Sequence, residues 1–238
     1  MRVAVLMPVY GERERLGPTL RALREAAEPL GGVTVFLVDD GSEPPLDEAE
    51  IPARSGSFRV VLGRHAVNLG QGAALETARQ LALRAAPAEV YATMDSDGQH
   101  RASDLAALCL AIDRGADVAL GDRFSGQSNV PPFRRVVLRV ARLVERLLTG
   151  LALSDAHNGF RAFSRRALEH LAIKENRMAH ATELTYRISR AQKVESLRVV
   201  EVPVSIRYTE ATLDKGQSSL GAFTILRDLF HRYLFEER

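Results

Sequence analysis

The chain has 238 residues and a mass of 26.2 kDa, the size of one ordinary domain. With 46% hydrophobic and 26% charged residues, its composition excludes disordered, collagen-like and coiled-coil chains. A single cysteine, Cys109, excludes an internal disulfide bond and a zinc site built from cysteines. Charge is unevenly distributed, because residues 1–120 carry 12 Lys and Arg against 17 Asp and Glu, whereas residues 121–238 carry 20 against 13. This asymmetry favours a cation near the first half and an anionic group near the second.

Targeting signals are absent from the pattern of the sequence. No apolar run approaches the roughly 18 residues that suggest a membrane span. Residues 1–5 lead directly into a strand-like segment, without the charged, apolar and cleavage regions of a secretory signal. We therefore expect a cytoplasmic protein.

The first half alternates between strand and helix patterns. Short apolar runs closed by turn residues predict strands over Val3–Val9, Val33–Val38, Arg59–Leu62, Val90–Met94 and Asp117–Leu120. Helical patterns lie between them, and they predict a helix with Pro18 in its first turn, a helix over Ala73–Ala85, and a helix capped by Ser103 and Asp104 that ends at Ile112. Such alternation predicts an α/β fold with a mostly parallel sheet and helices on both faces. Ligands bind these sheets at the carboxyl ends of the strands, so we expect the functional residues there.

The second half is less regular but contains no linker that requires a second domain. Its patterns predict helices over Phe133–Leu148, Ala179–Ala191 and Gly221–Phe235, a strand over Arg198–Tyr208, and a polar loop over Thr209–Ser219. The first of these helices is amphipathic and its polar face is strongly basic, with Arg134, Arg135, Arg139, Arg142 and Arg146. We therefore expect residues 1–238 to form a single domain.

The strongest local signal is Asp95-Ser96-Asp97-Gly98-Gln99-His100, which directly follows a predicted strand. Two carboxylates one residue apart, with an amide oxygen after them, suit Mg²⁺ or Mn²⁺. The same letters also occur in solvated turns, so the pattern alone leaves both interpretations open.

Two further strand ends are acidic. Asp39 and Asp40 follow the second predicted strand, and a carboxylate there can accept hydrogen bonds from a ribose or a base. Glu12 follows the first predicted strand, which we expect Pro8 to end. Like charges crowded at one edge of a sheet cost stability unless a cation or ligand offsets them.

Seven segments, in this order, resemble the family 2 glycosyltransferases with the GT-A fold, and among these the dolichyl- or polyprenyl-phosphate mannose or glucose synthases. The segments are Pro8–Glu12, Val38–Ser42, Asn68–Ala74, Met94–His100, Gly121–Phe124, Asp155–Arg161 and Val202–Val204. Together they cover roughly residues 3–208. The resemblance implies a GT-A (Rossmann-like) α/β domain with a nucleotide-sugar-binding half over residues 1–122, and an acceptor-side half with C-terminal helices over residues 123–238.

The resemblance also implies roles for individual residues. The nucleotide-sugar donor would be bound by Pro8, Val9, Tyr10, Glu12, Val38, Asp39, Asp40, Asp95, Ser96 and Arg207. Mg²⁺ or Mn²⁺ would be held by Asp95, Asp97 and Gln99. The residues closest to the chemistry would be Asp97, Arg123 and Asp155, and the acceptor would be bound by Arg123, Arg134, Arg135 and Arg161.

The chain departs from the family pattern at three points. The family usually has Asn where this chain has Gly11, and Ser-Gly-Phe-Arg where it has Asn158-Gly159-Phe160-Arg161. The lysine of the synthases' acceptor loop is replaced in Gly216–Ser219. The nature of the acceptor therefore stays open at this point.

The expected reaction is a metal-dependent, inverting transfer of a sugar from a UDP- or GDP-linked donor to a polyprenyl or dolichyl phosphate. A hydroxyl acceptor is the alternative, and Asp155 would then be the base. A more distant alternative is an NAD(P)-binding oxidoreductase, because Gly70–Leu75 is almost a dinucleotide fingerprint.

A lipid acceptor implies contact with a membrane. The helix expected over residues 133–148 has an apolar stripe and a basic face, which suit interfacial docking. We therefore expect a peripheral protein on the cytosolic face of the membrane, docked directly or through a membrane partner, and no nucleic-acid partner.

Overall fold

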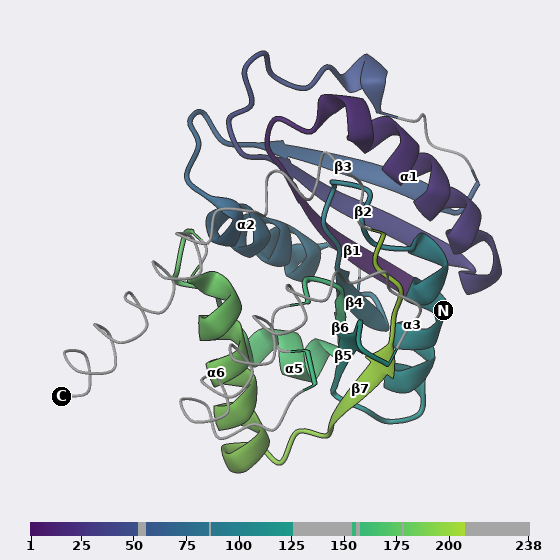
Figure 1. The fold of residues 1–238 in the computed structure, drawn as a ribbon, viewed down its shortest axis with the longest axis vertical. Coiled ribbons are helices and arrows are strands. Elements are labelled where there is room, and N and C mark those ends of the chain that lie inside the picture. Colours follow the sequence, from purple (N-terminus) through teal and green to yellow (C-terminus); the bar gives the residue numbers. More distant parts are fainter. Residues whose placement is uncertain (52–55, 86, 126–153, 156–157, 178, 208–238) are drawn as a thin grey trace, which may run out of the picture.

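The computed structural model describes residues 1–51, 56–85, 87–125, 154–155, 158–177 and 179–207. Within this part of the chain a seven-stranded sheet has the order β3-β2-β1-β4-β6-β5-β7 (Figure 1). Only β6 runs antiparallel to its neighbours, β4 and β5. The strands are β1 (Arg2–Val9), β2 (Gly32–Asp39), β3 (Phe58–Arg64), β4 (Val90–Thr93), β5 (Val118–Asp122), β6 (Arg161–Phe163) and β7 (Val199–Pro203). The predicted α/β fold with a mostly parallel sheet is confirmed.

Helices cover both faces of the sheet, as predicted (Figure 1). The α-helices are α1 (Arg13–Ala27), α2 (Gln71–Arg84), α3 (Leu105–Asp113), α5 (Arg165–His170) and α6 (His180–Val194). Short 3₁₀ turns occupy Glu28–Leu30, Glu48–Glu50 and Ala102–Asp104. Helices α1 and α3 pack on one face, and helices α2, α5 and α6 pack on the other.

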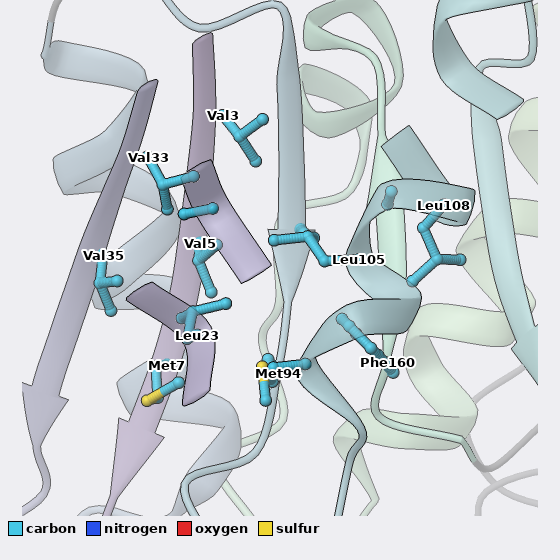
Figure 2. Packing of buried hydrophobic residues seen from close by; sticks show 14 of the residues in the cluster. Val3, Val5, Met7, Leu23, Val33, Val35, Met94, Leu105, Leu108 and Phe160 are labelled. Carbon is cyan, nitrogen blue, oxygen red and sulfur yellow. The ribbon is translucent and has the colours of Figure 1, made fainter. Parts of the chain in front are cut away.

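The sheet separates two hydrophobic cores. Side chains alternate along β1, so Val3, Val5 and Met7 pack toward α1 and α3, whereas Ala4 and Leu6 pack toward α2 and α6. Figure 2 shows the first of these cores, with Leu23 of α1 and Leu105 and Leu108 of α3 against the strands. Because both faces are covered, the central strands are apolar at nearly every position.

One predicted helix start is wrong, and one predicted side-chain cap is not formed. Helix α1 begins at Arg13, because the Glu12 carbonyl accepts the amides of Arg15 and Leu16 at 3.0 and 2.9 Å, and Pro18 therefore lies inside the helix. Ser103 and Asp104 do not cap α3 and instead belong to a 3₁₀ turn. The Asp104 carboxylate accepts the amide of Ser205 at 2.6 Å, which ties this turn to the segment after β7.

Among the later elements, strand β7 is shorter than its pattern suggests and helix α6 is longer. Strand β7 ends at Pro203, and an isolated bridge between Ile206 and His100 follows it. Strand β6 and helix α5 were not predicted, whereas the helix predicted over Ala179–Ala191 is α6. The segments Phe133–Leu148, Thr209–Ser219 and Gly221–Phe235 lie outside the described residues.

Candidate active site

Three loops meet at the carboxyl edge of the sheet, where the parallel strands β1, β2 and β4 end. The register pairs Val9 at the end of β1 with Asp39 at the end of β2. The main chain continues this pairing, since the Asp40 amide donates to the Val9 carbonyl at 2.9 Å and the Met94 amide donates to the Leu6 carbonyl at 3.1 Å. The acidic residues after these strands therefore lie at one edge, as the sequence predicts.

Pro8 does not end the first strand. It is buried within β1, pairs in register with Val38, and is followed by the buried Val9. The main-chain groups of Pro8, like those of Leu6, face the side of β1 where β4 lies. Strand β4 ends at Thr93, before it reaches the level of Pro8. The missing N–H of Pro8 therefore costs no ladder hydrogen bond.

The loop after β1 presents an aromatic ring and a carboxylate. Tyr10 is 56% exposed, and the partly buried Glu12 pairs with Arg15 at 3.0 Å. Gly11 has a φ of +65°, and its amide donates to Ser42 Oγ at 3.1 Å. Asn tolerates this left-handed conformation better than most residues, so Gly11 preserves the turn that the family's Asn would make.

Asp39 is fully buried and faces its own loop. Its carboxylate accepts the amides of Ser42 and Leu46 at 3.0 and 3.1 Å, and Arg64 lies 3.5 Å away. Every one of these contacts is made within the protein. The side chain shapes the loop after β2, and a direct nucleotide contact stays a prediction.

Asp40 is also buried and joins its loop to the segment before α2. Its Oδ1 lies 2.7 Å from His65 Nδ1 and accepts the Leu69 amide at 3.0 Å, while its Oδ2 accepts the Gly70 amide at 2.7 Å. Asp40 therefore fixes the loop that leads into α2. The predicted contact of Asp40 with the donor stays a prediction.

The carboxylate of Asp95 is held on both of its oxygens. Gln71 Nε2 donates to Oδ1 at 2.9 Å, and His100 Nε2 lies 3.0 Å from Oδ2. Behind the carboxylate, a Cβ built at Gly159 would lie 2.5 Å from Oδ2, so this close approach requires glycine. Asp95 is thus held by Gln71 at the start of α2 and by His100 in its own loop.

The surroundings of Asp95 favour its ionised form. Burial is the largest single influence and raises the pKa of Asp95, but the hydrogen bond and charge of His100 lower it, and the net shift is downward. The charges of His180 and Arg161 lower the pKa further. Asp95 is therefore a fixed negative charge at this edge of the sheet.

The surroundings of Asp97, unlike those of Asp95, favour its protonated form. Its pKa is raised by burial and by the negative charges of Asp95 and Glu12, although its Oδ1 accepts the Gln99 amide at 3.0 Å. A bound cation would offset this repulsion between carboxylates. Of the carboxylates of Glu12, Asp95 and Asp97, only that of Asp97 has no basic or amide side chain bonded to it within the part of the chain that the structure describes. It is therefore the carboxylate best suited to hold a metal directly.

The donor set fits a metal that is shared with a ligand. Among the described residues no group of three or more His, Cys, Asp or Glu side chains could enclose a metal ion. Mg²⁺ is commonly held by one or two carboxylates together with substrate phosphates and water rather than by a full protein cage. Asp95, Asp97 and the partly exposed Gln99 fit that arrangement.

A cavity of about 710 Å³ lies beside Asp97, between α1 and the segment 94–103. This volume is in the range of small-molecule sites. Three basic side chains line it, those of Arg15, Arg101 and Arg207. Arg207 is exposed, and its amide donates to the Gln99 carbonyl at 2.9 Å, so the end of the described chain is tied to the loop that contains Asp95 and Asp97. The predicted diphosphate contact of Arg207 stays a prediction.

Ser96 contributes its main chain rather than an exposed hydroxyl. It is buried, and its carbonyl accepts the hydroxyl of Thr19 in α1 at 3.2 Å. This bond fixes the loop between the two aspartates against α1.

On the other side of Asp95, Arg123 and Asp155 form a buried ion pair. Arg123 Nε lies 2.5 Å from Asp155 Oδ2, which also accepts the Arg123 amide and the Asn158 side chain at 3.0 and 3.2 Å. The structure thus brings together Arg123 and Asp155, which the resemblance implies are close to the chemistry.

Arg161 is buried in the sheet, whereas a residue that binds the acceptor is expected to be exposed. It is buried in β6, where it pairs in register with Thr93 and Leu120. From there its charge acts on Asp95 and His180. Its contact with an acceptor stays a prediction. Arg134 and Arg135, the other predicted acceptor residues, lie outside the described part of the chain.

Sequence analysis did not identify three residues that surround Asp95. His100 is 7% exposed and lies against Asp95. Burial lowers the pKa of His180, which stands at the start of α6. Gln71 carried no signal beyond its place between two glycines. The position of His100 within the aspartate loop was the only local clue.

The start of α2 excludes the dinucleotide interpretation. In a dinucleotide fold the first amides of this helix would face a pyrophosphate. Here the amides of Gly72 and Ala73 donate to the Asn176 carbonyl at 2.8 and 3.4 Å, and the Gly70 amide donates to Asp40. The segment 175–177 therefore covers the place that a pyrophosphate would need.

The described helices include none that is both long and apolar enough to cross a lipid bilayer.

Comparison with known proteins gives consistent matches over most of the chain. Residues 4–172 match the model of Glycosyl transferase family 2. The chain is 31% identical over 225 residues to the polyprenol monophosphomannose synthase of Mycolicibacterium smegmatis, with 92% of this chain and 82% of that protein covered. It is also 31% identical to the undecaprenyl-phosphate mannosyltransferase of Micrococcus luteus, with 93% and 89% covered.

Among solved structures, the fold is similar to that of glucosyl-3-phosphoglycerate synthase from Mycobacterium tuberculosis, crystallised with Mn²⁺, UDP and glucosyl-3-phosphoglycerate. The TM-score is 0.65 and the identity 19%, over 97% of this chain and 79% of that one. At this identity the likeness concerns the fold alone.

Proposed function

Since this chain belongs to glycosyl transferase family 2 and is a glycosyltransferase, we propose that it moves a sugar from a nucleotide-diphosphate sugar to a polyprenyl phosphate. The observation that carries the donor half of this proposal is the crowding of Asp97 by Asp95 and Glu12 at the carboxyl edge of the sheet. The acceptor half is supported by two relatives whose names specify polyprenyl acceptors.

The donor site would use a divalent metal. Asp97 would hold Mg²⁺ or Mn²⁺ directly, and Asp95 and Gln99 would complete the protein's share of the ligands. When bound, such an ion neutralises negative charge on the diphosphate leaving group. Two crystal structures of the glucosyl-3-phosphoglycerate synthase of the same fold contain UDP together with Mn²⁺ or Mg²⁺, which is consistent with this proposal.

The remaining residues would orient the donor and receive its charge. Tyr10 and the loops fixed by Asp39 and Asp40 would frame the nucleotide. Arg207 extends from the metal-site loop as an exposed cation beside the cavity, where it would contact the diphosphate. Arginine suits this role because its guanidinium offers several donors in a rigid plane.

The transfer would be a single displacement with inversion. An oxygen of the acceptor phosphate forms a bond to the anomeric carbon while the bond from that carbon to the nucleoside diphosphate breaks on the opposite face. The acceptor oxygen is already anionic, so this step requires no general base. Arg123, held by Asp155, would lie on the acceptor side.

A donor and acceptor screen tests the proposal. The purified chain is incubated with UDP- and GDP-linked sugars, with Mg²⁺, Mn²⁺ or EDTA, and with or without a short-chain polyprenyl phosphate. We expect nucleotide release that depends on metal and increases with the lipid phosphate, and a glycosylated lipid as product. Turnover at full rate in EDTA would reject the metal, and release without lipid glycosylation would reject the acceptor.

A further inference from the structure

The clamp on Asp95 suggests how the donor site is kept ready for its metal. Gln71 stands at the start of α2, and His100 lies at the end of the loop that contains Asp95 and Asp97. Each makes one hydrogen bond to Asp95, and each bond ends on a different carboxylate oxygen, at 2.9 and 3.0 Å. A carboxylate held on both oxygens has little freedom to rotate.

His100 is itself held firmly in place. Its ring packs on Phe160 with centroids 5.1 Å apart, its main chain bridges to Ile206, and it is 7% exposed. Asp95 is ionised and can only accept hydrogen bonds, so Nε2 must be the nitrogen that donates to it. Nδ1 is buried and has no hydrogen-bond partner within the described part of the chain. Among the described residues, the only hydrogen bond of the His100 ring is therefore the one to Asp95.

Gln71 is fixed from the other direction. The helix that it begins is anchored by the Asn176 carbonyl, which accepts the Gly72 amide at 2.8 Å. The residues before Asn176 are in turn held by two carboxylates, because Glu76 accepts the Ile173 amide and Glu183 accepts the Glu175 amide, at 2.9 and 2.8 Å. The side-chain amide of Gln71 thus reaches Asp95 from the start of α2, which these contacts hold in place.

From this geometry we infer that Gln71 and His100 are positioning residues, which lock the carboxylate of Asp95 so that the metal and the nucleotide diphosphate meet a preformed acceptor. The inference rests on the proposed metal-dependent donor site. It assigns neither residue a contact with the metal. Residues that orient metal ligands typically contribute about 10–100-fold to metal affinity or activity.

The test is a set of double-mutant cycles read by Mn²⁺ binding in the presence of UDP or GDP, followed by electron paramagnetic resonance. Gln71→Leu and His100→Leu each remove one donor while keeping apolar bulk. We expect each to weaken Mn²⁺ binding by about 10-fold or more. In an Asp95→Ala background the same two changes should have no further effect, because the residue through which they act is gone.

Conservative variants separate positioning from bulk packing. His100→Gln places an amide nitrogen near the position of Nε2, and Gln71→His keeps an uncharged N–H donor at pH 8, so each should recover most of the Mn²⁺ affinity. Gln192→Leu, at a partly exposed position on α6, is the matched control for Gln71→Leu. His170→Leu, at an exposed position on α5, is the control for His100.

The outcomes distinguish this inference from the function on which it rests. If Asp97→Ala and Asp95→Ala leave Mn²⁺ binding unchanged, the metal site itself is wrong. If those variants lose the metal but Gln71→Leu and His100→Leu do not, the positioning role is wrong. Losses that persist in the Asp95→Ala background would also overturn it, since they would show a general effect on the fold.

Discussion

Arg123 donates two hydrogen bonds to one oxygen of Asp155, from its main-chain amide at 3.0 Å and from its Nε at 2.5 Å. Asn158 donates a third hydrogen bond to the same oxygen, at 3.2 Å. Asp155, which could act as a general base, therefore also orients Arg123. Two roles are open to Asp155, proton acceptor for a hydroxyl or anchor for Arg123, and they predict different results.

We expect Asp155→Asn to keep transfer to a polyprenyl phosphate within about 10-fold of the wild type, because an asparagine oxygen still accepts these hydrogen bonds and an anionic acceptor needs no base. A residue that acts as a general base typically contributes about 10²–10⁴-fold. Steady-state transfer rates, measured below the melting temperature of the variant, distinguish the two cases. A loss of about 100-fold or more in a folded variant would support a hydroxyl acceptor.

Asp155→Ala should behave differently, because it removes the carboxylate that accepts the main-chain amide and the Nε of the buried Arg123. Loss of one member of a buried ion pair typically costs about 3–5 kcal/mol. We expect a loss of this size in the free energy of unfolding, measured by urea denaturation. Glu169→Gln is the control, since Glu169 pairs with Arg165 at 2.9 Å on the surface, where such a pair contributes about 0–1 kcal/mol.

The fold could be predicted from the sequence wherever the pattern was local and long. Strands β1 and β2 are apolar along most of their length because helices cover both faces, and the acidic residues that follow them are adjacent in sequence to the strands that place them. Strand β6 could not be found in this way. It has three residues, too few to show a period, and it pairs with β4 and β5, which lie far from it in the chain.

The clamp on Asp95 was missed for the same physical reason. Gln71 reaches Asp95 only because β1 and β4 are neighbours and α2 starts beside them, a relationship that depends on tertiary packing. His100 follows both aspartates in the same loop, but its contact with Asp95 depends on how that loop folds. Pro18 was placed by a statistical preference for first turns, whereas the Glu12 carbonyl starts the helix earlier.

The raised pKa of Asp97 leads to a prediction about stability without metal. Folding favours the protonated form of a group whose pKa is raised above its ordinary value of 3.8. The contribution of Asp97 to stability is therefore fully present below that value and is lost as the pH rises through the raised pKa. At pH 7 without metal, we expect Asp97→Asn to raise the melting temperature by about 2 °C.

The same change should abolish the stabilisation that Mn²⁺ and UDP give the wild type, together with donor turnover. Thermal melts at pH 4 and pH 7, with and without Mn²⁺ and UDP, measure both effects, and the advantage of Asp97→Asn should shrink at pH 4. Asp113→Asn, on the exposed end of α3, is the control. A metal-free variant that melts below the wild type at pH 7 would contradict the repulsion among the three carboxylates.

Gly72 allows a test of the packing that supports Gln71. A Cβ at this position would lie 1.9 Å from the Glu175 carbonyl oxygen and 2.7 Å from His180 Cβ. We expect Gly72→Ala to destabilise the protein by about 1–3 kcal/mol, as overpacking of a close contact does. Because the start of α2 must shift, Mn²⁺ binding should weaken as well.

Gly17→Ala is the matched control for Gly72→Ala. Gly17 lies inside α1, where an added Cβ would meet only Arg21 Nη1, at an ordinary 3.5 Å. Replacement of a helical glycine of this kind is neutral or stabilising by up to about 1 kcal/mol. Urea denaturation of the two variants side by side measures the difference. Equal stability of the two variants would show that segment 175–177 does not press on α2.

The lipid acceptor leads to a prediction about Arg134 and Arg135, which the sequence places on the basic face of an amphipathic helix outside the described residues. We expect the chain to sediment with vesicles that contain anionic lipids at low salt and to be released as salt rises, because exposed charges are screened. Arg134→Glu with Arg135→Glu should weaken this binding and reduce transfer to a short-chain polyprenyl phosphate. The slow hydrolysis of the donor by water should be preserved, since it requires only the donor site.

A control for net charge separates this role from a general electrostatic effect. Arg21→Glu with Arg59→Glu changes the net charge by the same amount at two exposed positions, and it should leave both vesicle binding and transfer close to the wild type. If both pairs reduce vesicle binding equally, only the total charge matters. If the Arg134 and Arg135 variant loses transfer and donor hydrolysis together, these arginines support the fold or the donor site, and the acceptor phosphate must be held elsewhere.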